Sequence, residues 1–377
     1  MKRKICFVVN VEYVVNHFLI NHLASLSKIY DVTLIGNFDR LRLLEENGID
    51  VKIYRIPFKR GINLFSDIFA FGMLFMFFLK NKFDVIHSFT PKMGFFTSIL
   101  GYVLRFKKRV HFFTGQVWAY DKGVIASFLK LADKVTGALT THCLVDSLSQ
   151  LKFLHANGIL HKSKGLVLGA GSISGVDTNR FKFNQDKRVS IRRQFAIPSD
   201  AFCLVFIARL LESKGIYDLI KALECIDSSA IYLFVVGPDE EGVIDRVIDE
   251  FPDLLDNIKF VGYSSTPEHF LSAGDVLTLP SYREGFGSVI IEAASVGIPA
   301  IASDIYGILD AVDDGNSGLL HKPRDINAIA ANIQKLYADP LLLQSLGDFA
   351  HQRAIKDFNA KTITSLWVNF YHDIFEQ

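Results

Sequence analysis

The chain has 377 residues, half of them apolar, and a formal net charge of +1. This length exceeds what one hydrophobic core usually supports, so we expect two α/β domains. No zinc-ligand spacing and no aromatic-basic RNA-binding pattern is present, which excludes the usual nucleic-acid readers. The cysteines lie in apolar contexts without a C-x-x-C pair and indicate buried thiols of a reducing cytoplasm: Cys6, Cys143, Cys203 and Cys225.

The charge is divided between the two halves of the chain. Residues 1–182 carry 25 Lys and Arg against 12 Asp and Glu, or +13, whereas the remainder carries 16 against 28, or −12. A basic half suits anionic lipid, a diphosphate group or nucleic acid. Dispersed solvating charge explains the same numbers equally well, so both interpretations stay open.

The first segment, MKRKICFVVNVE, begins like a signal peptide, but Asn10 and Glu12 interrupt its apolar run and no small-residue cleavage site follows. We therefore predict a first β-strand. Further β-rich runs alternate with helical patterns, which indicates a parallel sheet covered on both faces. These runs are DVTLIG, VKIYRI, DVIHS, RVHFF, HCLVD and GLVLG.

The most hydrophobic stretch is residues 62–79, of which only the twelve residues 68–79 are free of polar side chains. Twelve residues cannot span a bilayer as a helix. The segment is either a buried helix or one that dips into a membrane surface, and the second alternative predicts lipid binding through Phe75, Phe77 and Phe78. The flanking cations that suit a membrane surface are Lys59, Arg60, Lys80 and Lys82.

A later strand end in the first half carries polar residues. The segment HSFTPKMG places Thr90 and Lys92 after a strand. Lys92 either contacts a phosphate of the donor or acceptor or is a plain loop cation, and both alternatives stay open.

A Gly- and Ser-rich passage, residues 169–187, breaks the alternation and is the expected hinge. The pattern then resumes with FCLVFIA, IYLFVVG, NIKFVG, DVLTLP and PAIAS. We place the domains at residues 1–180 and 181–358, with a C-terminal helix at 359–377 that returns to the first domain. Two doubly wound sheets of this kind bind ligands at the carboxyl ends of their strands.

Two cations follow the strand FCLVFIA, in the segment ARLLESKG. Arg209 and Lys214 are five residues apart and can meet one diphosphate, Arg209 through its fork and Lys214 as a point charge. The alternative is a surface Arg and a Lys at a helix start. Gly215 and the helical pattern after it favour the diphosphate site.

The segment TLPSYREGFGSVIIE, residues 278–292, combines a buried strand, a turn and a helix. Gly287 and Ser288 can open and cap the helix, and Glu292 then shares a face with Ser288. A helix N-terminus attracts phosphate, and a carboxylate can accept hydrogen bonds from two ribose hydroxyls. Glu284, in the turn, can do the same for a sugar. A capping acid and a solvated helix Glu are the plain alternative, but the combination favours a nucleotide-sugar site.

No Asp-x-Asp pair occurs in the chain. A protein without this Mg²⁺-bridging arrangement has to neutralise a leaving diphosphate with side chains and a helix N-terminus. Arg209, Lys214 and the helix start at Gly287 are the candidates, so no metal and no other cofactor is expected.

The passages AGSISGVDTNRF, ARLLESKG and PSYREGFGSVIIEAASVGIPAIASDIYGILDAV resemble retaining glycosyltransferases of family 4, in particular bacterial enzymes that build O-antigen, capsule or lipid-linked oligosaccharide. The resemblance covers essentially the whole chain and implies the GT-B fold. It implies an acceptor-binding first domain and a second domain that binds the nucleotide-sugar. Its most specific part is the pair Glu284 and Glu292.

By this resemblance, Arg209 and Lys214 hold the donor diphosphate, Glu292 holds the ribose and Glu284 meets the transferred sugar. The other implied donor-side residues are Gly285, Phe286, Gly287, Ser288 and Val289, with Gly262 and Tyr263 near the base.

The first half departs from the family twice. Many members have a Gly-rich loop after the first strand, but no glycine stands here between Asn10 and His22. Many members have His-Gly where this chain has Thr114 and Gly115, so the expected His is missing. Strand alternation indicates that His111 is a packed or solvent-facing side chain rather than its replacement. The candidates for the acceptor or phosphate side are Asn10, Glu12, Thr90, Lys92, Thr114, Gly115 and Gln116.

We expect a cytoplasmic enzyme, peripheral on the inner face of the membrane. It would transfer a hexose or N-acetylhexosamine from a nucleoside diphosphate, with UDP expected, to a lipid-linked or saccharide acceptor with retention of configuration. Expected partners are this donor, this acceptor and an anionic membrane surface. The alternatives are a nucleotide-sugar epimerase or phosphorylase on the same fold, or a non-catalytic sugar-nucleotide-binding scaffold. The intact pairs Arg209 with Lys214 and Glu284 with Glu292 argue against the scaffold.

Overall fold

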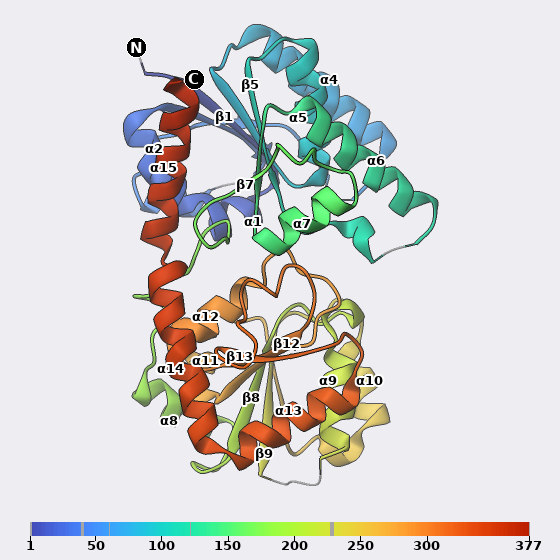
Figure 1. The fold of residues 1–377 in the computed structure, drawn as a ribbon, viewed down its shortest axis with the longest axis vertical. Coiled ribbons are helices and arrows are strands. Elements are labelled where there is room, and N and C mark those ends of the chain that lie inside the picture. The colour runs from blue at the N-terminus through green and yellow to red at the C-terminus, as the bar shows by residue number, and fades with distance from the viewer. Residues whose placement is uncertain (1, 39–40, 60, 121, 227–229, 377) are drawn as a thin grey trace. The chain divides into compact units, whose positions relative to one another are not determined.

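The computed structural model describes residues 2–38, 41–59, 61–120, 122–226 and 230–376 (Figure 1). The chain forms two compact units, which we call unit 1 and unit 2. Unit 1 comprises Met1–Ser174 and Ala360–Gln377, and unit 2 comprises Gly175–Asn359. The units divide after Ser174, where the sequence indicated a boundary after residue 180. Arg60, one of the predicted flanking cations, lies outside the described residues.

Unit 1 is built on a parallel seven-stranded sheet in the order β3-β2-β1-β4-β5-β6-β7. The strands are β1 (Lys4–Val11), β2 (Asp31–Asn37), β3 (Lys52–Arg55), β4 (Val85–Phe89), β5 (Lys108–Phe113), β6 (His142–Val145) and β7 (Leu166–Val167). The predicted first strand is therefore confirmed. The strand order reverses between β1 and β4, so the carboxyl ends of these strands form the topological switch point of the sheet.

Helices cover both faces of this sheet (Figure 1). On one face lie α2 (Ile20–Ile29) and α15 (Ala360–Glu376), and on the other lie α4 (Leu64–Lys80), α5 (Pro91–Val103) and α6 (Val124–Leu139). Shorter helical elements are α1 (Glu12–Val14), the π-helical η1 (Val15–Leu19), α3 (Arg42–Glu46), the 3₁₀ turn η2 (Val117–Ala119) and α7 (Leu148–Ala156). Trp367 and Tyr371 of α15 are fully buried in unit 1.

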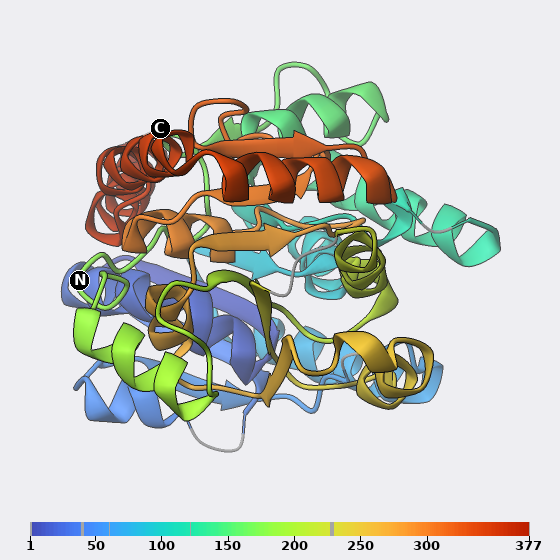
Figure 2. The ribbon, with the colours of Figure 1, turned by 90° about the horizontal axis from the view of Figure 1, so that it is seen from below.

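Unit 2 repeats the architecture with a parallel six-stranded sheet in the order β10-β9-β8-β11-β12-β13. The strands are β8 (Phe202–Ile207), β9 (Ile231–Val236), β10 (Ile258–Gly262), β11 (Val276–Leu279), β12 (Ala300–Ser303) and β13 (Gly318–His321). The helical elements are α8 (Gln185–Gln194), η3 (Glu212–Lys214), α9 (Ile216–Glu224), α10 (Val243–Glu250), η4 (Pro252–Leu254), α11 (Pro267–Ala273), α12 (Ser288–Val296), α13 (Ile326–Ala338) and α14 (Pro340–Asp357). Helices α13 and α14 follow one another directly and contact each other (Figure 2).

Both units are doubly wound parallel α/β folds, so the predicted fold class is confirmed. The return of the last helix to unit 1 is confirmed as well. Among the described residues, no helix is both long and apolar enough to cross a membrane.

The hydrophobic stretch at 62–79 forms most of α4, and its two faces differ. Ala70, Leu74, Phe77 and Phe78 are buried in the core at helical spacing. The interpretation of Phe77 and Phe78 as lipid-contacting residues is therefore wrong, because this spacing turns both rings toward the sheet. The opposite face exposes Leu64, Phe65, Ile68, Phe69, Met76 and Leu79.

Three of the four cysteines are buried as expected, but Cys225 is exposed. Cys225 follows the last residue of α9, and the next position, Ile226, takes the buried place in the core of unit 2. The apolar context in the sequence therefore belongs to its neighbours.

Candidate active site

The predicted donor residues of unit 2 stand on two loops at the carboxyl edge of its sheet. The β8–α9 loop carries Arg209 and Lys214, and Lys214 ends the 3₁₀ turn η3. Gly215 follows with a φ of +73°, and a Cβ on this residue would lie 2.0 Å from the carbonyl oxygen of Pro280. Only glycine allows the β8–α9 loop to approach the β11–α12 turn this closely.

The β11–α12 turn carries Glu284 and leads into α12. Gly287 is the N-cap residue of α12, in the left-handed conformation, and no side chain caps the helix. Ser288 was expected to help cap the helix, but it is the first helical residue and its hydroxyl lies past the cap position. The first N–H groups of α12 thus lack a side-chain partner. Glu292 lies one turn further along the helix, as predicted.

Lys214 and Glu284 are in direct contact. Lys214 Nζ donates to Glu284 Oε1 at 2.6 Å, and both side chains are mostly buried. The predicted cation and the predicted sugar-binding acid therefore meet, although they are far apart in sequence.

Arg209 has a different partner, which the sequence reasoning missed. Its Nη1 donates to Glu240 Oε2 at 2.8 Å, and both side chains are more than a third exposed. Glu240 follows β9, the neighbour of β8 in the sheet. The segment PDEEG directly after the strand IYLFVVG was the signal that could have revealed it. Each predicted diphosphate cation thus carries a carboxylate partner.

Glu292 is partly buried, and within the described chain its carboxylate makes no hydrogen bond. Burial raises its pKa to about 7, while Arg180 lowers the pKa and Glu268 raises it. Arg180 itself is paired with Glu268 at 2.9 Å. Acids without a hydrogen-bond partner and with a raised pKa are common in binding sites.

The remaining donor-side residues have distinct environments. Gly262 ends β10 with a φ of +75°, and its carbonyl oxygen accepts from the Gly237 N–H at 2.8 Å. Tyr263 is largely exposed, whereas the ring of Phe286 is buried against Phe358, with ring centroids 5.4 Å apart. Gly285 and Val289 are partly buried.

In unit 1, Asn10 and Thr90 stand at the carboxyl ends of the adjacent strands β1 and β4. Within the described residues, Asn10 Oδ1 and Thr90 Oγ1 are buried and have no hydrogen-bond partner. Thr90 also has a φ of +69°, an outlying conformation for a β-branched residue, which is typical of functional sites. Glu12 opens α1 and accepts from Asn16 Nδ2 at 2.9 Å.

Lys92 is held inside unit 1. Its Nζ donates to Asp67 Oδ1 at 2.8 Å and to the carbonyl oxygens of Lys59, at 2.9 Å, and Gly61. An ammonium group has three donors, so these contacts use all of them. A phosphate on Lys92 would have to displace Asp67. The plain loop cation is not observed either, because Lys92 stands in the first turn of α5 and is mostly buried.

The loop after β5 folds onto α7. The Thr114 carbonyl oxygen accepts from Gln116 Nε2 and from Gln150 Nε2, at 2.5 and 2.7 Å. The Gln116 side chain is buried, and Gly115 between them is partly buried. His111 is packed, as interpreted: its Nδ1 contacts Ser88 Oγ at 2.9 Å, and burial lowers its pKa to about 3.

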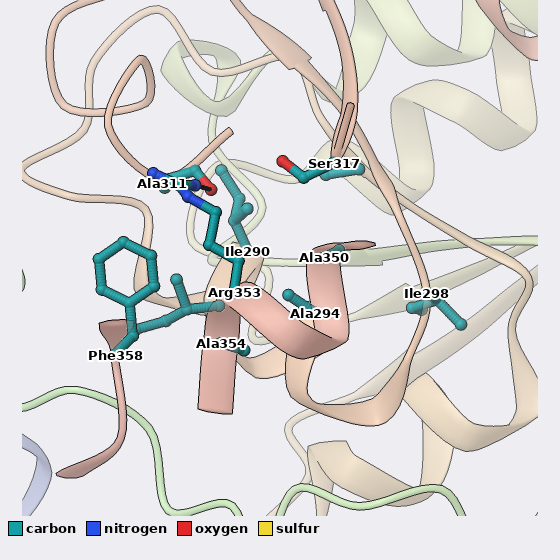
Figure 3. A pocket seen from close by; sticks show the side chains of 11 residues that line it. Ile290, Ala294, Ile298, Ala311, Ser317, Ala350, Arg353, Ala354 and Phe358 are labelled. Atoms are coloured by element: carbon teal, nitrogen blue, oxygen red, sulfur yellow. Dashed lines mark hydrogen bonds between the residues drawn. The ribbon is translucent and has the colours of Figure 1, made fainter. Parts of the chain in front are cut away.

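Figure 3 shows a pocket beside α12 and α14 that is lined mostly by apolar side chains, together with Ser317 and Arg353. Arg353 donates to the carbonyl oxygens of Ala311 and Asp310, at 2.8 and 2.5 Å. The described lining residues include no predicted site residue. Backbone groups therefore occupy the guanidinium of Arg353, and the pocket is a packing gap between helices.

Known proteins resemble this chain in sequence and in fold. It is 27% identical over 372 residues to the capsular polysaccharide biosynthesis glycosyltransferase CapM of Staphylococcus aureus, covering 94% of this chain and 97% of CapM. HepE of Anabaena, solved in complex with UDP, superposes with a TM-score of 0.80 at 19% identity, covering 99% of this chain and all of HepE. Sucrose-phosphate synthase of Thermosynechococcus elongatus gives 0.82 at 21% identity over the full length of both chains.

The two structural neighbours confirm the GT-B fold. A known protein family also matches part of unit 2, and this part holds Arg209, Lys214, Glu284 and Glu292. Residues 187–353 match the family described as "Glycosyl transferases group 1".

Proposed function

We propose that this protein is a retaining glycosyltransferase that moves a hexose or N-acetylhexosamine from a nucleoside diphosphate, with UDP expected, to a lipid-linked or saccharide acceptor in bacterial surface polysaccharide synthesis. The observation that carries the proposal is the contact of Lys214 with Glu284 beside the uncapped start of α12, with Glu292 unpaired one turn along that helix. The similarity to CapM and the UDP bound to HepE support the reaction class and the nucleotide.

In this proposal, the donor diphosphate binds Lys214, Arg209 and the first N–H groups of α12. It replaces the carboxylates of Glu284 and Glu240 as the partners of the two cations. Glu284 is then released to accept hydrogen bonds from the transferred sugar, while Glu292 accepts them from the ribose. The acceptor hydroxyl oxygen bonds to the anomeric carbon of the sugar as the bond from that carbon to the stabilised diphosphate breaks. The leaving diphosphate helps to take the acceptor proton on the same face, which retains the configuration.

We assign the acceptor saccharide to the carboxyl edge of β1 and β4 in unit 1. Val8 pairs with Ser88, so Asn10 and Thr90 end neighbouring strands at the same edge. Both present neutral polar atoms without partners, which suit sugar hydroxyls better than a phosphate. Lys92, the cation at this edge, is already engaged by Asp67.

We also propose that unit 1 binds the inner face of an anionic membrane through α4 and α6. Helix α6 packs inward through small residues such as Ala126, Ala132 and Gly137 and turns Val124, Phe128 and Leu131 to the outside. This reverses the usual amphipathic pattern of a surface helix. The exposed apolar residues of α4 add to the same kind of surface.

The charges beside these two helices suit anionic lipid. In the described chain, Lys80, Lys122 and Lys134 are exposed. The acids of α4 and α6 are engaged internally, Asp67 with Lys92 and Asp133 with Trp118 Nε1 at 2.7 Å. Apolar side chains flanked by exposed cations are typical of interfacial binding.

A donor screen followed by an activity assay tests the proposed function. UDP-, GDP- and dTDP-sugars are ranked by thermal stabilisation, and the best donor is assayed for release of the nucleoside diphosphate with and without a saccharide acceptor. Lys214→Ala should lower turnover by about 100-fold, as expected for loss of a preorganised cation. Lys221→Ala, on the exposed side of α9, is the control. Unchanged turnover in Lys214→Ala would contradict the proposal, and acceptor-independent conversion of the donor would indicate an epimerase.

Chelation tests the proposed independence from metal, which rests on the missing Asp-x-Asp pair. Turnover should survive EDTA with at most a modest loss. Complete loss with EDTA, followed by recovery with Mg²⁺ or Mn²⁺, would contradict the proposal.

A further inference from the structure

The two loops that carry Lys214 and Glu284 are joined by more than their ion pair. The Tyr282 N–H donates to the carbonyl oxygen of Ser213 at 2.9 Å. Gly215 lies against the Pro280 carbonyl so closely that only glycine fits. The β8–α9 loop and the β11–α12 turn therefore form one joined structure at the edge of the sheet.

The side chain of Tyr282 extends this connection to α9. Tyr282 Oη donates to Asp218 Oδ2 at 2.8 Å, and Asp218 stands in the first turn of α9 with 8% of its surface exposed. The guanidinium of Arg324 lies 4.7 Å from the centre of the Tyr282 ring. Burial, followed by the bond to Asp218, raises the pKa of Tyr282 to about 12, so its hydroxyl remains a donor at physiological pH.

We propose that the Tyr282–Asp218 hydrogen bond fixes the spacing between Lys214 and Glu284 and thereby sets the preference of the site for a nucleotide-sugar over the free nucleotide. This inference rests on the proposed function, in which Lys214 meets the diphosphate and Glu284 meets the sugar. Tyr282 and Asp218 are positioning residues, because they act through the two loops.

The physical reason is that the two ligands use the site differently. A free nucleotide needs the cations, the α12 N-terminus and Glu292. A nucleotide-sugar also needs Glu284 at a fixed distance from the cations, and displacements of the order of 1 Å at a reacting centre cost about 100-fold in rate. Loss of the Tyr282 hydroxyl leaves the buried Asp218 without this donor and frees the turn from α9. The backbone contacts of Ser213 and Gly215 remain, so the fold persists.

The experiment compares Tyr282→Phe with the wild type. Calorimetry gives Kd for UDP and for the UDP-sugar found in the donor screen, and steady-state assays give kcat. We expect Kd for UDP to stay within about twofold. The ratio of Kd for UDP to Kd for the UDP-sugar should fall by about tenfold, because binding of the UDP-sugar weakens, and kcat should fall by about tenfold as well. Tyr217→Phe is the matched control, because Tyr217 also lies beneath a guanidinium, that of Arg246 at 4.4 Å, but stands on α9 outside the turn.

The ratio separates positioning from general stability. A variant that is only less well folded loses active protein for both ligands alike, so its ratio equals that of the wild type, and this result would overturn the inference. Asp218→Ala should reproduce the Tyr282→Phe ratio, whereas Asp218→Asn, which keeps an acceptor oxygen, should restore it toward the wild-type value. The double variant Tyr282→Phe with Asp218→Ala should lose no more than either single variant. If the double variant instead lost the product of the two single losses, the two residues would act independently and the inference would be overturned.

The outcome for the wild type stands apart from these results. If the wild type neither binds nor turns over any nucleotide-sugar, both the proposed function and this inference are wrong. If the wild type is active and the ratio in Tyr282→Phe is unchanged, only the positioning role fails.

Discussion

Glu292 lacks a hydrogen-bond donor within the described chain, and burial raises its pKa from the ordinary 4.5 to about 7. Ribose hydroxyls donate most strongly to the ionised form, so a nucleotide should bind better as the pH rises through 7. Ionisation also has a cost for folding. Between pH 4.5 and 7 the folded protein holds a proton that the unfolded chain releases, so this group lowers stability as the pH rises through that window.

We predict that Glu292→Gln weakens UDP binding by about tenfold at pH 8 and much less at pH 6, where the wild-type carboxyl is already protonated. The same variant should have a higher Tm than the wild type at pH 8, because it removes a buried charge. Calorimetry and thermal unfolding at both pH values measure the two effects. Glu224→Gln, at an exposed acid on α9, is the control. Equal pH dependence of UDP binding in the wild type and Glu292→Gln would remove Glu292 from the site.

A second prediction at the scale of residues rests on the ion pair of Arg209 with Glu240. Exposed pairs of this kind contribute about 0.2–1 kcal/mol, and in the proposed function a diphosphate replaces Glu240 as the partner of Arg209. Glu240→Gln should therefore tighten UDP binding by up to about fivefold at low salt, with less gain at high salt. Titrations at two salt concentrations measure this. Weaker binding would mean that Glu240 holds Arg209 in its binding position.

At the scale of elements, the outer faces of α4 and α6 carry the proposed membrane contact. We predict that Phe65→Ser with Phe128→Ser leaves the fold intact and abolishes most binding to anionic vesicles, because both rings are exposed on the two helices. Cosedimentation with anionic and zwitterionic vesicles at low and high salt measures it.

Leu341→Ser is the matched control for this test, because Leu341 is 80% exposed on α14 of unit 2. It should leave vesicle binding unchanged. Phe77→Ser, in contrast, should destabilise unit 1, since Phe77 lies in its core. A folded wild type that ignores anionic vesicles at low salt would remove the membrane from the proposal.

The sequence was sufficient to predict the elements themselves. Alternating β-rich and helical patterns predicted two parallel sheets, because buried parallel strands leave continuous apolar runs. The spacing of Glu284 and Glu292 around one turn and one helix start placed both acids at the same strand end. These sequence patterns are local, and the elements that they predict are present in the structure.

The partners of the charges could not be predicted, because they depend on which strands become neighbours. Arg209 meets Glu240 on the neighbouring loop, and Lys92 of α5 meets Asp67 of α4, and no local pattern connects either pair. The exposure of the outward face of α6 could not be predicted either. Val124, Phe128 and Leu131 have the spacing of a core stripe, and only the packing of small residues on the opposite side turns them to the surface.

At the scale of the whole molecule, unit 1 depends on a helix that lies far from it in sequence. Trp367 is fully buried in unit 1, where its Nε1 donates to the carbonyl oxygen of Ile173 at 3.2 Å. His87 and Tyr371 are in contact beside it at 2.6 Å. Removal of α15 would therefore open the core of unit 1 while unit 2 keeps its own core.

We predict that Trp367→Ala costs unit 1 about 3–5 kcal/mol of stability, and that a chain ending at Asn359 leaves unit 1 unfolded and unit 2 folded. Urea unfolding and limited proteolysis with fragment identification measure these effects. His372→Ala, on the exposed side of α15, should change stability by less than about 0.5 kcal/mol. A truncated chain in which residues 1–174 resist proteolysis would contradict the prediction.

The position of α15 also has a consequence for the order of synthesis. The ribosome makes the strands of unit 1 first, but Trp367 and Tyr371 follow only after residues 175–359 have been added. Unit 2 is one continuous stretch of the chain and needs no later residue for its core, whereas the nascent unit 1 exposes the apolar surface that α15 will cover. The half of the protein that is made first therefore cannot complete its core until the last helix has been made, and during that interval its exposed apolar surface is prone to aggregation.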